Sequence, residues 1–216
     1  MSLAITLANQ YGIVMSADRR LTTTVTRSKT GEMESFVLTE HEQKLFLTRA
    51  GHGISYTGAS SLEEGKSTSC IIRKTLAQLD ETLSLKDEIL SIKKKLQAFS
   101  NERNVILIGA AVYEEKNGVI SSSLTENEIT ELTDKDGSCL AFSGESKIVI
   151  KLTDMFPVDR NAFPLQESIN YLRFLTRSVA GLQHYAQINQ TVSEDCDILV
   201  LRNSGAQWIT SPEILR

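Results

Sequence analysis

The order of the hydrophobic patterns constrains the fold more than any other feature of this 216-residue chain. Short strand-like runs come first, followed by two helical stretches, more strands, two further helical stretches and a last pair of strands. Blocks of this kind, in place of strict alternation of strand and helix, favour an α+β protein. We therefore expect a four-layer αββα sandwich, in which two antiparallel sheets pack together and a pair of helices covers each outer face.

Turn residues divide the expected strands into hairpins. Runs at 4–8 and 12–17 flank a short turn, and runs at 45–49 and 52–57 flank Gly51. The polar stretch at 27–41 is expected to form an exposed excursion between them. Residues 104–112 form a near-continuous apolar run, which is typical of a strand buried on both faces. The remaining expected strands lie near 118–123, 128–132, 138–143, 198–201 and 207–209.

Apolar residues spaced at about 3.6 positions predict four helices. The helical stretches are 61–79, 84–99, 144–156 and 164–182. Ser61 and Glu64 have the spacing of a capping box, which predicts the start of the first helix. Pro164 suits the first turn of the last helix. The three lysines at 93–95 are expected on a solvated helix face.

Composition excludes several classes of protein. A hydrophobic content of 41% without a Pro- or Gly-rich linker predicts one domain over residues 1–216. A net charge of −4 gives no basic surface for nucleic acid. The three cysteines lack the spacing of a disulfide framework or a zinc site, so we expect neither metal nor cofactor. No apolar stretch reaches about 18 residues and no secretory signal pattern is present, which predicts a soluble cytoplasmic protein without a membrane partner.

Two charged residues stand beside apolar strands. Asp18 closes the run from Gly12, and Lys44 opens the run that continues with Leu45. Burying a lysine is costly unless the ammonium is paired, and a paired, desolvated lysine is what amine-assisted nucleophilic catalysis requires. Taken alone, Asp18 followed by Arg19 is better interpreted as a surface ion pair of little energetic value, and the joint spacing with Lys44 and Gly58 reverses that interpretation.

Taken together, these residues carry a family resemblance. A hairpin ending in Ala-Asp-Arg, the strand-initial Lys44 and the run at 56–60 resemble the proteasome β-subunit-like family of N-terminal nucleophile (Ntn) hydrolases. Lys44 and Gly58 lie 14 positions apart (44 to 58), which matches the family's spacing from its lysine to the glycine of its oxyanion hole. Counting back 16 positions from Asp18 places the family's leading threonine at Ser2. The resemblance implies an Ntn-hydrolase-like fold.

The resemblance also implies a mechanism. Once Met1 is removed, Ser2 would be the N-terminus, its hydroxyl the nucleophile and its α-amine the base. Lys44, held by Asp18, would ease deprotonation of the hydroxyl, and the Gly58 N–H would bind the oxyanion. The implied function is therefore hydrolysis of peptide or other amide bonds in a peptide or protein substrate. Because such subunits usually assemble, the resemblance also implies a homo-oligomer such as a ring.

Two serines would complete this site, and their neighbourhoods differ in how well they fit. Ser143, in the run at 141–144, resembles the serine of a Gly-Ser-Gly segment that brings a hydroxyl to the amine. Ser193 would lie in the family's Arg-Asp-x-x-Ser-Gly segment, but Gln190 replaces its aspartate and Glu194 its glycine. A supporting carboxylate is then missing unless Glu194 or Asp195 supplies it.

Three hypotheses remain open from the sequence. The chain is an Ntn peptidase or amidohydrolase that acts through Ser2. Alternatively, it is a catalytically inactive subunit of the same kind, with a role in assembly or scaffolding. In the third hypothesis it is an unrelated two-layer α+β binding module, and the spacing of Asp18, Lys44 and Gly58 is a coincidence.

Overall fold

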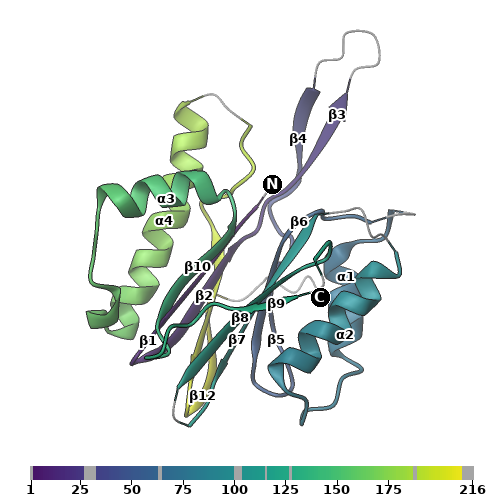
Figure 1. Ribbon diagram of the computed structural model, residues 1–216. Helices are drawn as coiled ribbons and strands as arrows, with labels where there is room; N and C mark the ends of the chain where they lie inside the picture. Colours follow the sequence, from purple (N-terminus) through teal and green to yellow (C-terminus); the bar gives the residue numbers. More distant parts are fainter. Residues whose placement is uncertain are drawn as a thin grey trace.

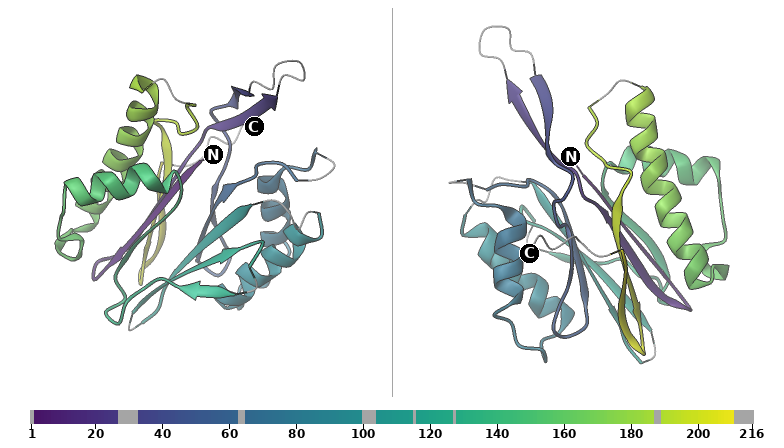
Figure 2. Two further views of the ribbon diagram at one scale, coloured as in Figure 1. Left: turned by 45° about the horizontal axis from the view of Figure 1, so that its top comes forward. Right: turned by 180° about the vertical axis from the view of Figure 1, so that it is seen from behind.

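The computed structural model describes residues 2–26, 33–62, 65–99, 104–114, 116–126, 128–186 and 189–210. Two five-stranded sheets pack face to face, and a pair of helices covers each outer face (Figures 1 and 2). Neighbouring strands in both sheets run antiparallel. The expected α+β sandwich of four layers is confirmed.

The first sheet has the strand order β10-β1-β2-β11-β12. Its strands are β1 (Leu3–Asn9), β2 (Gly12–Asp18), β10 (Cys139–Gly144), β11 (Cys196–Arg202) and β12 (Gly205–Thr210). Its outer face carries α3 (Ser146–Met155) and α4 (Leu165–Tyr185), with the short 3-10 helix η2 (Arg160–Ala162) between them.

Side chains that alternate along β1 explain why it lies between two layers. Leu3, Ile5 and Leu7 pack with the helices of the outer layer. Ala4 and Ala8 face the second sheet. Successive side chains of a strand point to opposite faces, so large residues fill the helix-facing core while small ones allow the two sheets to approach.

The second sheet has the strand order β5-β6-β7-β8-β9 and carries α1 and α2 on its outer face. Its strands are β5 (Leu45–Leu47), β6 (Gly53–Gly58), β7 (Val105–Val112), β8 (Asn117–Ser123) and β9 (Ile129–Glu131), and its helices are α1 (Thr68–Leu76) and α2 (Leu85–Gln97). Leu107 of β7 packs with the helices, whereas Ile108 and Ala110 face the first sheet. The prediction of a strand buried on both faces is confirmed.

The predicted start of the second helix is confirmed, and that of the first is corrected. Ser84 caps α2, because its side chain accepts a hydrogen bond from Asp87 N. The predicted start at Ser61 is wrong, since α1 begins at Thr68 and Ser67 supplies the cap. Ser61 instead forms an isolated bridge with Ser67. Glu64, the second member of the expected capping box, lies outside the described residues.

The prediction that all three lysines at 93–95 are solvated is wrong for Lys93. Its side chain is 5% exposed, and its ammonium contacts Ser122 Oγ at 3.4 Å and donates to Glu126 O. On the same helix Glu88 is also buried and lies 2.8 Å from His52 Nδ1. The inner face of α2 therefore carries charged groups that find their partners on the sheet and its loops.

A third, two-stranded sheet was not expected. It consists of β3 (Leu21–Thr26) and β4 (Met33–Thr39), which pair antiparallel and extend beyond the sandwich (Figure 1). The predicted excursion at 27–41 thus consists in part of β4, while residues 27–32 lie outside the described residues. Among the helices of the described ranges, none is long and apolar enough to cross a membrane.

Candidate functional site

Strand ends at one edge of the sandwich bring the predicted residues together. Ser2 precedes β1 and Asp18 ends β2, and these strands are antiparallel neighbours. Lys44 precedes β5 and Gly58 ends β6, which pair in the second sheet. Because the first strand of each hairpin starts where the second ends, all four residues lie at the same edge of the two sheets.

Asp18 and Lys44 form a buried ion pair. Lys44 Nζ lies 3.0 Å from both carboxylate oxygens of Asp18, and the side chains are 3% and 0% exposed respectively. The ammonium also donates to the Arg20 carbonyl oxygen. Two backbone N–H groups complete the shell of Asp18, with Leu3 N at 2.7 Å and Arg20 N at 3.0 Å. Both charges are thus paired and hydrogen-bonded, as burial requires.

The backbone of Ser2 is fixed by a hydrogen bond, whereas its hydroxyl has no partner among the described residues. Its carbonyl accepts a hydrogen bond from Glu145 N at 3.0 Å. The side chain is buried, and Ser2 Oγ has no hydrogen-bond partner among the described residues. A buried hydroxyl without a partner is costly in a folded protein and calls for an explanation. The hydroxyls of Thr6, Ser16 and Ser55 also lack a partner, but of these four described side chains Ser2 is the one that lines a cavity with Lys44 and Gly58, as a reacting group would.

Two glycines make the close backbone approaches of this edge possible. Gly144 has a φ of +92°, and a Cβ there would lie 1.7 Å from Ser2 O. Gly58 has a φ of +107°, and a Cβ there would lie 2.0 Å from Asn104 O. Neither position accepts a side chain without a shift of the backbone, so both glycines are required by geometry.

A small cavity of about 20 Å³ lies beside the candidate nucleophile. Its lining includes Ser2, Lys44, Gly58, Tyr56, Leu21 and Ser60. Tyr56 is 1% exposed, its ring stacks on Phe46 with centroids 6.4 Å apart, and its hydroxyl donates to Glu42 at 3.0 Å. Burial and the Glu42 carboxylate raise the pKa of the Tyr56 phenol well above its usual value near 10, so the phenol is neutral at physiological pH.

The two predicted orienting serines lie nearby, but neither is among the residues that line this cavity. Ser143 Oγ accepts a hydrogen bond from Thr57 Oγ1 at 2.9 Å. Ser193 Oγ accepts from Arg19 N at 3.0 Å and donates to Asp195 O at 2.7 Å. Ser193 lines a neighbouring pocket of about 360 Å³ instead. Both hydroxyls therefore have hydrogen-bond partners, whereas that of Ser2 has none among the described residues.

Sequence reasoning missed Arg20 and the partner of Arg19. Arg20 N and Arg20 O contact Asp18 and Lys44, as described above. Arg19 pairs with the buried Asp197 of β11, with its Nε 2.8 Å from Oδ1. Burial raises the pKa of the Asp197 carboxyl, and the Arg19 guanidinium offsets part of that rise. The contact from Arg20 N to Asp18 Oδ2 spans two residues, an Asx-type turn that the sequence Asp-Arg-Arg could have indicated.

Position 190 cannot supply the missing carboxylate, because Gln190 carries an amide. Its side-chain amide nitrogen lies 2.9 Å from His184 Nδ1, and its backbone carbonyl oxygen accepts a hydrogen bond from the Arg20 guanidinium at 3.2 Å. Glu194 and Asp195 are exposed. In the part of the chain that the structure describes, no group of three or more His, Cys, Asp or Glu side chains is arranged to hold a metal ion.

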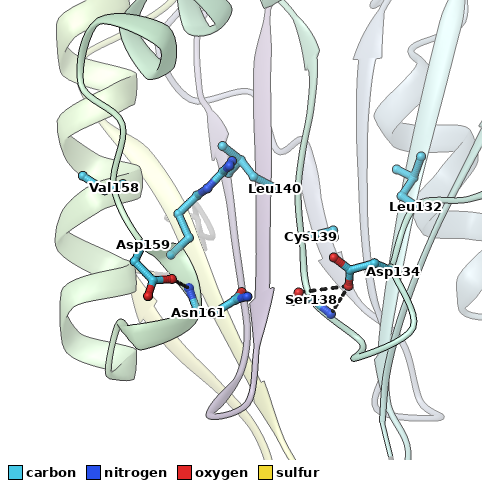
Figure 3. Close-up of a pocket in the computed structure, with 9 residues that line it drawn as sticks. Leu132, Asp134, Ser138, Cys139, Leu140, Val158, Asp159 and Asn161 are labelled. Carbon is cyan, nitrogen blue, oxygen red and sulfur yellow. Dashed lines mark hydrogen bonds between the residues drawn. The ribbon is translucent and has the colours of Figure 1, made fainter.

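The larger pocket in Figure 3 is distant from these residues. It measures about 380 Å³ and is lined by residues that include Cys139, Asp134 and Asp159. Cys139 pairs with Ala8, six positions along β1 from Ser2, which is about 20 Å along a strand. The carboxylates of this pocket make local hydrogen bonds that stabilise turns: Asp134 accepts from Ser138 N, and Asp159 accepts from Asn161 N. The cavity beside Ser2, with its buried ion pair and hydroxyl, is therefore the better candidate for an active site than this pocket.

This edge combines an unpartnered hydroxyl, a buried ammonium and a glycine on one cavity. Such a set can place a nucleophile, a stabilising positive charge and a backbone N–H around one reacting carbonyl. The layers and the antiparallel sheets around it define the class: an α+β protein with an Ntn-hydrolase-like fold.

Comparisons with known proteins support the fold and not a family. No protein-family model matches the chain, and no curated protein matches its sequence. A mutant of Anbu from Hyphomicrobium sp. strain MC1 is similar in structure, with a TM-score of 0.62 and 16% identity over 99% of this chain and 89% of that one. Anbu (ancestral beta-subunit) from Yersinia bercovieri has a TM-score of 0.61 and 13% identity over 98% and 88%. At such identity the similarity shows the fold alone.

The assignment of the chain to the proteasome β-subunit-like family is therefore wrong. No family model matches, and the similar structures are those of Anbu, at 16% and 13% identity. The spacings from Ser2 to Asp18 and from Lys44 to Gly58 agree with the fold, because each spans a single hairpin, β1–β2 or β5–β6. A spacing fixed by strand lengths is shared by families with the same sandwich, so it cannot distinguish among them.

Proposed function

We propose that the protein is an Ntn hydrolase that cleaves peptide or other amide bonds, with Ser2 as the nucleophile after Met1 is removed. The observation that carries the proposal is the buried Ser2 hydroxyl, which has no partner among the described residues and shares a cavity with Lys44 and Gly58. Residues 1–216 are proposed to form the single domain that carries this site.

The reaction follows from the groups at the cavity. The Ser2 α-amine takes the hydroxyl proton, and Oγ attacks the carbonyl carbon of the substrate. The Lys44 ammonium, fixed by Asp18, favours the developing alkoxide, and the Gly58 N–H donates to the oxyanion. The amine then passes the proton to the leaving nitrogen as the C–N bond breaks. Water, deprotonated by the same amine, hydrolyses the ester on Ser2 and restores the hydroxyl.

Ser143 and Ser193 are proposed as orienting groups for the Ser2 amine. Ser143 lies opposite Ala4 in the pairing of β10 with β1, two positions from Ser2 along the strand. Ser193 donates to Asp195 O and accepts from Arg19 N, which fixes its loop beside the end of β2. Each would act through its position at this edge and not as a nucleophile.

A second candidate function is supported by Gln190. The Gln190 side chain is an exposed amide within hydrogen-bond distance of His184, so this position provides no carboxylate near the Ser2 amine. A chain without that carboxylate could retain Asp18, Lys44 and Gly58 for stability alone. In this case the protein would be a catalytically inactive subunit with a role in assembly or scaffolding.

The intact mass of the untagged full chain, expressed from its own gene, tests the proposal. The protein is treated with an epoxyketone peptide, which forms a ring with an N-terminal hydroxyl and the amine beside it. We expect a chain without Met1 that gains one inhibitor mass, mapped to Ser2, and no gain in Ser2→Ala. Retention of Met1, or the absence of any adduct, would support the inactive subunit instead.

We also propose that the protein assembles with copies of itself. Exposed apolar side chains occur on β4, where Phe36, Val37 and Leu38 follow one another, and on α3 and α4, where Met155 and Tyr185 are the most exposed. Exposed apolar side chains that occur together on one element mark contact sites in many proteins. A closed ring would also confine the proposed hydrolase, whose natural substrates we propose to be peptides or proteins.

A further inference from the structure

Arg20 stands between the buried ion pair and the β3–β4 hairpin. Its backbone N–H donates to Asp18 Oδ2 at 3.0 Å, and its carbonyl oxygen accepts from Lys44 Nζ. The two peptide groups that flank this one residue therefore contact both members of the pair. Any rotation of the Arg20 backbone would change the position of the Lys44 ammonium.

The side chain of Arg20 fixes that backbone from the other side. Its Nε lies 2.9 Å from Glu40 Oε1 and 3.2 Å from Glu40 Oε2. One terminal nitrogen also donates to Gln190 O at 3.2 Å. The planar guanidinium presents its donors in a fixed geometry, so contacts to two separate loops define its orientation as well as its charge.

The ion pair of Arg20 with Glu40 also closes the base of the β3–β4 hairpin. Arg20 comes directly before β3, and Glu40 comes directly after β4. Leu21 pairs with Thr39 in the first step of the ribbon. The ribbon extends away from the sandwich (Figure 2). It meets the candidate site at its base, through these two residues and through the start of β3, where Leu21 and Thr22 line the cavity.

We propose that Arg20 and Glu40 form a positioning clamp through which the β3–β4 hairpin holds the Lys44 ammonium at the candidate site. The inference rests on the proposed hydrolase function. Arg20 also lines the cavity, but its backbone contacts to the site are made to Asp18 and Lys44, so it is a positioning residue in this scheme. Glu40 acts one step further away, by fixing the Arg20 side chain.

The clamp is suited to positioning more than to stability. Arg20 is 16% exposed and Glu40 is 43% exposed, and ion pairs open to solvent contribute little to folding. Displacement of a catalytic group by about 1 Å can slow an enzyme on the order of 100-fold. Loss of the clamp is therefore expected to slow the reaction without unfolding the protein.

A double-mutant cycle on the full chain tests the clamp. The variants are Arg20→Met, Glu40→Gln and the combination, with Arg20→Lys as the conservative replacement. The matched control is Glu131→Gln, which makes the same chemical change in the exposed pair of Glu131 with Lys116, 3.9 Å apart and away from the cavity. The measurements are kcat and KM on a peptide amide, the rate of capture by the epoxyketone peptide, and Tm.

We expect Arg20→Met to lower kcat about tenfold, with KM within about twofold and little change in Tm. Glu40→Gln should show a smaller loss in kcat, and the double variant should equal Arg20→Met because both changes break one clamp. Arg20→Lys should recover part of the rate, and Glu131→Gln should match the unmodified chain. If Arg20→Met does not fold, Glu40→Gln and Arg20→Lys still carry the test.

Two results overturn the clamp. The first is an unchanged kcat in Glu40→Gln and Arg20→Lys, and the second is a double variant whose loss is the product of the two single losses. A failure of the proposed function is recognised separately, because the unmodified chain would then show neither turnover nor capture, and this result overturns both.

Discussion

At the scale of single residues, the ion pair of Asp18 and Lys44 is the feature with the largest consequences for stability. Both side chains are almost completely removed from solvent, and each has hydrogen bonds besides the pair itself. Removing one partner leaves the other charge buried without compensation, which typically costs about 3–5 kcal/mol. We expect Lys44→Met to lower the free energy of unfolding by about this amount, as measured by urea denaturation.

The double variant Asp18→Asn/Lys44→Met serves as the control for this prediction. It removes both charges at nearly constant volume, so it should be more stable than Lys44→Met alone. Both variants should fail to react with the epoxyketone peptide, because the proposed mechanism needs the ammonium. A single variant as stable as the double one would show that the pair is not buried in solution.

Gly144 permits the closest backbone approach at the candidate site. A Cβ at this position would lie 1.7 Å from Ser2 O, and φ is +92°. Gly51 has a similar φ of +84°, but nothing lies within 4 Å of its added Cβ, so Gly51→Ala isolates the conformational strain of about 1–3 kcal/mol. We expect Gly144→Ala to be less stable than Gly51→Ala by at least about 2 kcal/mol in urea denaturation, and to lose capture at Ser2.

Tyr56 determines how much room remains beside Ser2. The cavity of about 20 Å³ holds little more than one water molecule, so a substrate residue that enters it must be small. We expect Tyr56→Ala to raise the ratio of kcat/KM for cleavage after leucine over cleavage after alanine by about tenfold or more. Tyr56→Phe keeps the ring and should leave the ratio unchanged. Equal ratios in all three proteins would show that Tyr56 does not limit the substrate.

At the scale of secondary-structure elements, α2 shows how a charged residue can belong to the core. The Lys93 stem is buried against the sheet and its ammonium contacts Ser122 Oγ and Glu126 O, whereas Lys94 is exposed on the same helix. Lys93→Ala loses the packing of the stem and leaves the Glu126 carbonyl without this donor, so we expect a loss of about 1–3 kcal/mol. Lys94→Ala should change stability by less than about 0.5 kcal/mol in the same urea titration.

Local patterns predicted the elements of the fold, because these patterns reflect which faces are buried. The run at 104–112 reads as a strand covered on both faces, and β7 is such a strand. The buried position of Lys93 could not be predicted, since its partners Ser122 and Glu126 come from a distant part of the chain. The start of α1 was misplaced for a related reason: Ser61 has capping chemistry, but its bridge to Ser67 holds it in an extended segment.

The candidate site likewise contains residues that were predicted from the sequence and residues that were not. The pairing of Asp18 with Lys44 was expected from the family resemblance and not from a local pattern, because β3 and β4 separate the two residues in the chain. Arg20 was missed, because its role depends on backbone contacts and on Glu40, which lies across a hairpin that the sequence did not predict. Tyr56 was missed as a wall of the cavity, since its position depends on the contacts to Glu42 and Phe46.

At the scale of the whole molecule, the fold is common to proteins that share almost no sequence with this chain. The similar Anbu structures are only 16% and 13% identical, yet they superpose over nearly the full length of this chain. Alternation of large and small apolar residues along central strands is sufficient to specify the four layers, and many sequences satisfy it. Function must therefore be argued from the residues at the cavity and from the surfaces that are specific to this chain.

The exposed surface of the β3–β4 ribbon carries the prediction on assembly. Phe36 is 49%, Val37 47% and Leu38 61% exposed, and alternate residues of a strand point to opposite faces, so the ribbon presents apolar groups on both sides. A two-stranded ribbon has no core of its own, and this one extends beyond the sandwich. We therefore expect the full chain to be oligomeric in sedimentation velocity experiments, with contacts between copies that include this ribbon.

Leu38→Glu tests that expectation, because it places a charge at the most exposed of the three positions. It should shift the protein towards the monomer and lower Tm only by the amount that self-association contributes, since Leu38 adds little to the core of its own chain. The matched control is Leu90→Glu, at a 41% exposed position of α2, which should sediment like the unmodified chain. If Leu38→Glu and the unmodified chain have the same oligomeric state, the ribbon is not the contact surface, and the apolar residues of α3 and α4 become the next surface to test.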